Sequence, residues 1–187
     1  MKMSLSDAPV WPPLPTVQEQ INKYVKMIDA WTNKKILAGF DYEVGGITYH
    51  FSYDLYDQNN FAQANSKAIM SLTLGNTSED ELKTTYGTLE DGSLNKDALP
   101  VPLPDEWTQV WQGHIDQDGM DNSVSITFNV NDFLALANAA GAHNQKQLGI
   151  GWTIKTALRS AATTDELKAL VKQYEVEEKY REATQDL

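Results

Sequence analysis

The side chains best suited to acid–base or metal chemistry are three histidines, His50, His114 and His143. Each is isolated, and no HxH, HxxxH or HExxH spacing places two of them on one face of an element. His50 and His114 fall on segments with strand patterns, so they could approach one another in the fold. Such a pair, with a nearby carboxylate, could bind zinc. Because single histidines are more often ordinary surface or half-buried residues, we expect no metal and no cofactor.

A carboxylate-rich string, DQDGMDN over residues 116–122, is the segment most similar to a cation-binding loop. A calcium loop of the EF-hand type has glycine at its sixth position and a bidentate glutamate at its twelfth. Counted from Asp116, glycine is fourth and Thr127 is twelfth, so the pattern fails. The string consists of turn formers, and we interpret it as a hairpin loop.

Nucleophile and phosphate-binding motifs are absent from the sequence, which contains no GxSxG, no phosphate loop, no GxGxxG and no cysteine. We therefore expect the protein not to be an enzyme. A small metal-binding protein or enzyme that uses His50, His114 and the 116–122 string remains a remote alternative.

Aromatic residues are the more informative group, since the chain has five tryptophans and eight tyrosines. Both types are favoured at protein interfaces, although packing in the core and sheet accounts for most of them. The Trp-Pro-Pro-Leu-Pro run of residues 11–15 cannot be helical and is either a peptide that docks into a partner or a rigid lead-in to the fold. The candidate partner-binding residues are Trp11, Pro12, Pro13, Leu14, Trp107 and Trp111.

Composition excludes several classes of function. Of the 187 residues, 41% are hydrophobic, which is too many for a disordered chain. The net charge of −11 repels DNA and anionic lipid. Because no apolar run approaches the roughly 20 residues that cross a bilayer and no secretory leader is visible, we expect a protein made in the cytoplasm that binds neither nucleic acid nor membrane.

The elements that must position these residues begin with a helix over residues 16–36, opened by the capping box of Thr16 and Glu19. A hairpin follows, because alternating apolar residues flank Gly45-Gly46, a pair typical of a two-residue turn. This turn predicts that Val44 pairs with Ile47, Tyr42 with Tyr49 and Phe40 with Phe51, all on one face.

The rest of the chain continues this alternation. We predict a helix over 57–74, a polar insertion over 75–106, a second hairpin over 107–129, a long helix over 131–161 that its glycines could break, and a capped helix from Thr163. The fold class is α+β: a single compact domain, helix–hairpin–helix–hairpin–helix–helix, with antiparallel hairpins packed against helices. The domain covers 16–174, with an extended N-terminal arm over 1–15 and a charged C-terminal tail over 175–187, either helical or frayed.

Four motifs in combination resemble a small family encoded in phage tail-fibre gene clusters, domain of unknown function 4376. They are GGITYHFSYD at 45–54 with Gln58 and Phe61; Trp111 with Asp121-Asn122, VSIT at 124–127 and NDFLALA at 131–137; Ala142-His143; and AATTDEL at 161–167. Together they cover about residues 17–74 and 107–171.

The resemblance implies no catalytic residues. It implies a bacteriophage tail component, such as a tail fibre, adaptor or baseplate-associated protein, located in the virion tail and acting on other tail or fibre proteins. Such proteins are usually symmetric homo-oligomers. The alternative is a tail-fibre assembly chaperone, which the acidic surface, proline-rich arm and charged tail would suit.

Overall fold

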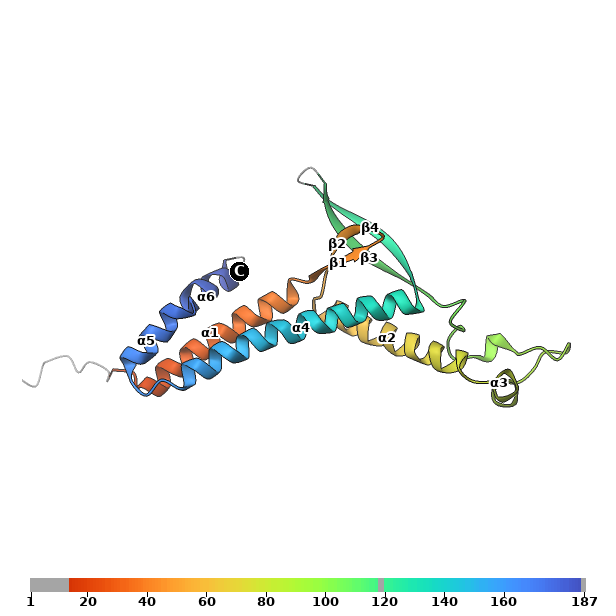
Figure 1. Ribbon diagram of the computed structural model, residues 1–187, viewed down its shortest axis with the longest axis horizontal. Helices are drawn as coiled ribbons and strands as arrows, with labels where there is room; N and C mark the ends of the chain where they lie inside the picture. Colours follow the sequence, from red (N-terminus) through yellow and green to blue (C-terminus); the bar gives the residue numbers. More distant parts are fainter. Residues whose placement is uncertain (1–13, 118–119, 186–187) are drawn as a thin grey trace, which may run out of the picture. The chain divides into compact units, whose positions relative to one another are not determined.

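The computed structural model describes residues 14–117 and 120–185, with side chains omitted at 116, 117, 120 and 121. Within them the chain is α+β, as predicted, with a four-stranded antiparallel sheet. The elements in order are α1 (Val17–Leu37), β1 (Phe40–Val44), β2 (Ile47–Phe51), α2 (Leu55–Gly75), α3 (Glu79–Tyr86), the 3-10 helix η2 (Lys96–Ala98), β3 (Thr108–Gln117), β4 (Met120–Asn129), α4 (Val130–Arg159), α5 (Thr164–Gln173) and α6 (Val176–Thr184) (Figure 1).

The chain forms two compact units. The sheet unit consists of residues 33–149, and the helical unit consists of the described residues before Asn33 and after Gly149. The helical unit therefore holds most of α1, the last part of α4, and all of α5 and α6. None of the helices in the described part of the chain is long and apolar enough to cross a membrane.

The sheet unit is built on the two hairpins. The predicted pairs Phe40–Phe51, Tyr42–Tyr49 and Val44–Ile47 are all present. The strand order is β1-β2-β3-β4, and β2 joins the second hairpin where His50 lies opposite His114. One face of the sheet packs against α2 and the first part of α4, around a core of mainly aromatic and small side chains: Phe40, Phe51, Tyr53, Phe61, Ala64, Ala68, Trp107, Phe128, Val130, Phe133, Leu136 and Ala140.

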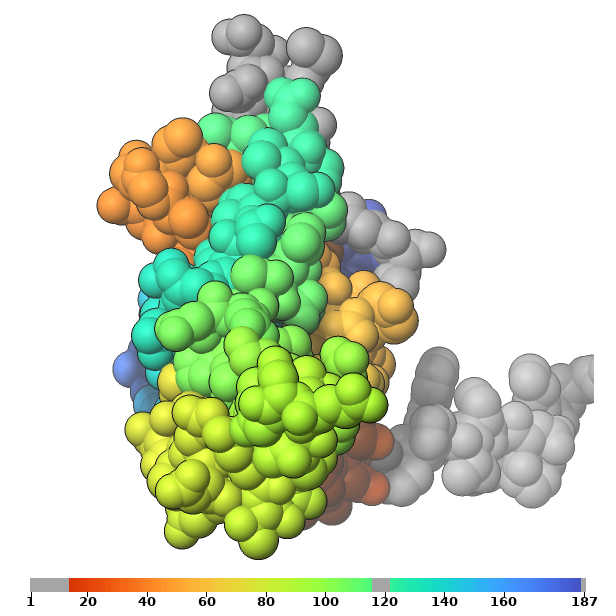
Figure 2. Space-filling model, turned by 90° about the vertical axis from the view of Figure 1, so that its right-hand side faces the viewer, coloured from red at the N-terminus to blue at the C-terminus, as the bar shows by residue number. Residues whose placement is uncertain are grey.

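The insertion at 75–106 is folded. Ser78 and Glu81 form a capping box that opens α3, and Thr88 makes an isolated antiparallel bridge to Leu94. The segment has a small core of its own, which holds it against the end of α2. This core consists of Leu74, Leu82, Leu94 and Val101. Figure 2 shows the segment, in yellow-green, as a compact body.

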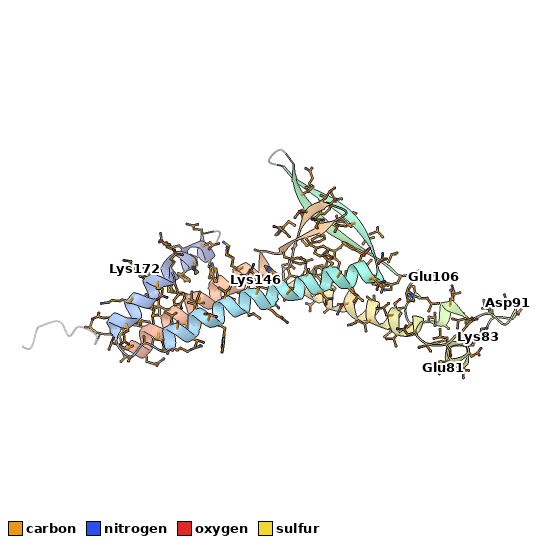
Figure 3. The ribbon with its side chains drawn as sticks, in the orientation of Figure 1. Glu81, Lys83, Asp91, Glu106, Lys146 and Lys172 are labelled. Atoms are coloured by element: carbon orange, nitrogen blue, oxygen red, sulfur yellow. The ribbon has the colours of Figure 1, made fainter. Side chains whose placement is uncertain are left out.

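This insertion carries charged side chains, among them Glu81, Lys83 and Asp91 (Figure 3). Lys83 forms an ion pair with Glu79 at 2.8 Å. Hydrogen bonds from the hydroxyl and backbone N–H of Ser93 lower the pKa of Asp91. These contacts are exposed to water and contribute little stability, so the segment's apolar core is what holds it.

The helical unit has a separate core of aliphatic side chains and one tryptophan: Ile21, Met27, Ile28, Trp31, Ile154, Leu158, Ala161, Leu167, Val171 and Val176. The charged tail expected at 175–187 is largely helix, since α6 occupies most of it. Val176 is fully buried, and the indole of Trp31 donates a hydrogen bond to Glu182 at 3.0 Å. The buried valine and the indole hydrogen bond both attach α6 to the helical unit.

Two further boundaries differ from expectation. The α4 helix is continuous through Gly141, Gly149 and Gly151. The second hairpin spans nearly the predicted residues, but its strands are longer and its loop shorter than expected, since β3 and β4 remain paired to Gln117 and Met120. Most of the string at 116–122 that was expected to be a loop is therefore strand, because backbone pairing across two adjacent antiparallel strands overrides the turn preferences of Asp and Asn.

Candidate protein-binding surfaces

The predicted partner-binding residues are in different environments. Trp11, Pro12 and Pro13 lie outside the described residues. Leu14 is 93% exposed, whereas Trp107 is 4% exposed and packs against Phe133 at a ring-centroid distance of 5.6 Å. Trp111 is half-buried, with its ring centroid 4.0 Å from that of Phe61. Packing in the sheet-unit core thus buries Trp107 and much of Trp111, so these two side chains do not form an exposed aromatic patch.

The fold brings two of the three histidines together, as the strand patterns allowed, and leaves the third apart. His50 lies opposite His114, while His143 is elsewhere in the sheet unit, with its ring beside Phe40 and Tyr53. Nδ1 of His50 is 2.8 Å from a carboxylate oxygen of Asp41, and its Nε2 is 2.7 Å from the carbonyl oxygen of Ala38. Both neighbours are hydrogen-bond acceptors, so a ring nitrogen that carries a proton can donate to the acceptor beside it.

Each ring nitrogen of His50 therefore has a neighbour within hydrogen-bond distance. Nε2 of His143 likewise lies 3.1 Å from the carbonyl oxygen of Lys35. Among the described residues, no three His, Cys, Asp or Glu side chains are grouped so that they could hold a metal ion.

The sheet face opposite the core is mostly polar. It carries Val110, Gln112 and His114 on β3 and Ser123, Ser125 and Thr127 on β4. The amide of Gln112 links the two strands, because it donates to the hydroxyl of Ser125 at 2.8 Å and accepts from that of Ser123 at 3.0 Å. Hydrogen bonds between side chains therefore order this face.

A groove of about 520 Å³ lies beside the first half of β3, where β2 has ended and α2 passes. Its lining is rich in amides and other polar groups: Ser52, Asp57, Asn60, Gln63, Ala64, Lys67, Gln109, Val110, Trp111, Gln112 and His114. The side-chain amide of Gln109 donates to the carbonyl oxygen of Val110 at 3.0 Å. This carbonyl group at the strand edge therefore already has a hydrogen-bond partner.

The helical unit has a larger and more apolar groove of about 840 Å³ between α1 and α6. Met27, Ala30 and Tyr180 provide the apolar part of its lining. Charged side chains of both signs complete it: Glu19, Lys23, Lys26, Glu177 and Arg181. Concave apolar surfaces with a few polar groups are the usual form of a binding site.

Several large apolar side chains point into solvent. Trp152, in the helical-unit part of α4, is 67% exposed. In the sheet unit, α2 exposes Leu55 and Tyr56 at its start, at 69% and 75%, and Ile69 and Met70 further along, at 51% and 45%. Tryptophan is normally well buried, so Trp152 is the least expected of these side chains.

Neither Trp152 nor the α1–α6 groove was among the predicted sites. The sequence signal for Trp152 is its position in the helical pattern, since it falls between the buried positions Gly151 and Ile154 on the opposite side of the helix. No sequence pattern predicted the groove, because its shape depends on how α6 packs against α1.

Comparison with known proteins gives a family match. A family model described as domain of unknown function (DUF4376) matches residues 19–174, a range that includes the 75–106 insertion. No curated protein and no solved structure matches the chain.

Proposed function

The chain belongs to the DUF4376 family, and from that premise we propose that it is a non-catalytic protein that works by binding other proteins, as a component of a bacteriophage tail. Within the tail its role is that of a fibre, adaptor or baseplate-associated protein. The sequence motifs resemble a family encoded in phage tail-fibre gene clusters, and this resemblance supports the phage context.

The observation that carries the binding role is the exposure of Trp152. A tryptophan that is 67% exposed on a well-packed helix leaves a large apolar ring in water. Tryptophan, with tyrosine and arginine, is enriched among the side chains that dominate binding energy at protein interfaces. Single exposed apolar residues are common on monomers, but an indole contributes far more buried area on binding than an alanine or valine does.

Replacement of Trp152 tests this role. We expect Trp152→Ala to weaken capture of the products of neighbouring tail genes by roughly tenfold or more, as for a residue at the centre of an interface. Binding is measured by co-purification and by calorimetry with the captured protein. Thr156→Ala, an exposed neighbour on the same helix, is the matched control and should bind as the unmodified chain does.

The virion location is tested separately by mass spectrometry of purified phage particles. Stoichiometric copies in the particle support a tail component. A complex with a fibre protein that forms in cells but is missing from particles would instead identify the assembly chaperone. If the chain neither binds the products of neighbouring genes nor occurs in particles, the proposal is overturned.

A further inference from the structure

The two edges of the sheet are different. On one side the sheet ends with β1, a strand of five residues whose outward positions on the polar face carry the carboxylates of Asp41 and Glu43. On the other side it ends with β4, a strand of ten residues. No strand in the described part of the chain pairs with the outer side of β4. From Ser123 to Asn129, the backbone N–H and C=O groups on that side therefore have no strand partner among the described residues and can pair with another strand.

Natural proteins usually protect such an edge with lysine, proline, an inward-pointing charge or a bulge. The β4 segment Asn122–Asn129, with the sequence NSVSITFN, has none of these. It contains no charge, no proline and no glycine, and its register with β3 continues without a bulge from Thr108–Asn129 to Gln117–Met120. In a chain with a net charge of −11, a regular and uncharged strand edge is a distinctive surface.

We propose that a second copy of this chain pairs with β4, strand to strand and antiparallel, so that two four-stranded sheets join into one of eight. The inference rests on the protein-binding role proposed above and names one partner for it. An edge without charge suits a second copy because two acidic chains repel each other wherever charged surfaces meet. Antiparallel pairing of identical strands also gives the closed two-fold symmetry that most homodimers have.

The side chains of β4 suit antiparallel pairing with β4 of a second copy. In a register centred on Ser125, that residue lies opposite Ser125 of the second copy, and Val124 lies opposite Ile126. Val124 and Ile126 are half-buried and share the core face with Phe128, while Ser123, Ser125 and Thr127 are exposed on the polar face. Apolar thus meets apolar and hydroxyl meets hydroxyl, which is the arrangement that stabilises cross-strand pairs.

Alternative registers are less suitable. A slip of one residue would put Val124 opposite Thr127 and set the core face of one sheet against the polar face of the other. A shift of the centre toward Ile126 would bring the pairing closer to the start of α4 at Val130. The register centred on Ser125 keeps the paired residues within the uncharged run.

The first experiment is a measurement of the dimer dissociation constant of the full chain by analytical ultracentrifugation. Ser125→Lys places two ammonium groups opposite one another in the dimer and should raise that constant by about tenfold or more, since like charges directly opposite are destabilising. Gln112→Lys is the matched control. It breaks the same side-chain hydrogen bond and adds the same charge on the same face, one strand away from the edge, and it should leave the constant within about threefold.

The second experiment uses the absence of cysteine from the natural sequence. Ser125→Cys should form a disulfide-linked dimer on mild oxidation, whereas Thr48→Cys, exposed on the internal strand β2, should remain monomeric under denaturing electrophoresis. Circular dichroism of each variant verifies that it is folded. Because the cysteine variant adds no charge, it tests the pairing even if Ser125→Lys unfolds the sheet.

A chain that stays monomeric at every soluble concentration overturns the inference, as does a dimer that is weakened equally by Ser125→Lys and Gln112→Lys. Absence of a disulfide cross-link in the Ser125→Cys variant has the same consequence. None of these results bears on whether the chain is found in phage particles, so failure of the dimer and failure of the tail role are distinguishable.

Discussion

At the scale of single residues, the helical unit depends on Gly151. A Cβ atom built there would lie 2.3 Å from Oγ1 and 3.1 Å from Cγ2 of Thr32, so only glycine lets α4 approach α1 this closely. Thr32 is 5% exposed, and its hydroxyl has no hydrogen-bond partner among the described residues. The contact is therefore a steric one, between a bare backbone and a buried β-branched side chain.

Gly151→Ala should destabilise the protein by about 1–3 kcal/mol, the usual cost of an overpacked core. The free energy of unfolding is measured by urea denaturation. Gly141→Ala is the control, because nothing lies within 4 Å of its added Cβ, and alanine should stabilise that helical position by up to about 1 kcal/mol. If the two variants have equal effects, the close contact is not the cause.

At the scale of elements, capping boxes define where helices begin. The hydroxyl of Thr163 accepts a hydrogen bond from the backbone N–H of Glu166, and the Glu166 carboxylate accepts from the backbone N–H of Thr163 in return. Thr16 and Glu19 form the same arrangement at α1, where hydrogen bonds from Thr16 lower the pKa of the Glu19 carboxyl. Each box satisfies N–H groups that the first helical turn leaves without internal partners.

Thr163→Ala removes the hydroxyl acceptor from α5 and should cost about 1 kcal/mol. The melting temperature and the urea midpoint both report this change. Thr163→Ser retains the acceptor, so it should behave nearly as the unmodified chain; an equal loss in the serine variant would mean that the threonine methyl group, and not the cap, is responsible.

At the scale of the whole molecule, two compact units have separate cores. Leu167 is fully buried in the helical unit, and Phe133 is fully buried in the sheet unit. Local opening of a protein follows such cooperative units, and each has its own free energy. Damage to one core should therefore affect the amides of that unit first.

Leu167→Ala should destabilise the helical unit by about 2–5 kcal/mol through the cavity it leaves. Hydrogen exchange should accelerate most in α5, α6, the start of α1 and the end of α4. Phe133→Ala should accelerate exchange chiefly in the sheet and α2. Identical exchange patterns in the two variants would show that the chain opens as one cooperative body.

The sequence alone determined the local features of this protein. Gly45-Gly46 and the alternation around it fixed the first hairpin and its register, and the Thr163–Glu166 spacing fixed the start of α5, because turns and caps depend on residues a few positions apart. The family match over 19–174 also follows from sequence. Helical periodicity located α1, α2 and α4 to within a few residues.

Only the tertiary structure decided which side chains are accessible. Trp107 directly precedes β3 and Trp152 lies on α4, and the first is 4% exposed whereas the second is 67% exposed. The folding of 75–106 around Leu82 and Leu94, the attachment of α6 through Val176, and the edge position of β4 were likewise decided by packing. The physical reason is that burial and edge position depend on contacts between residues distant in sequence, which no local pattern specifies.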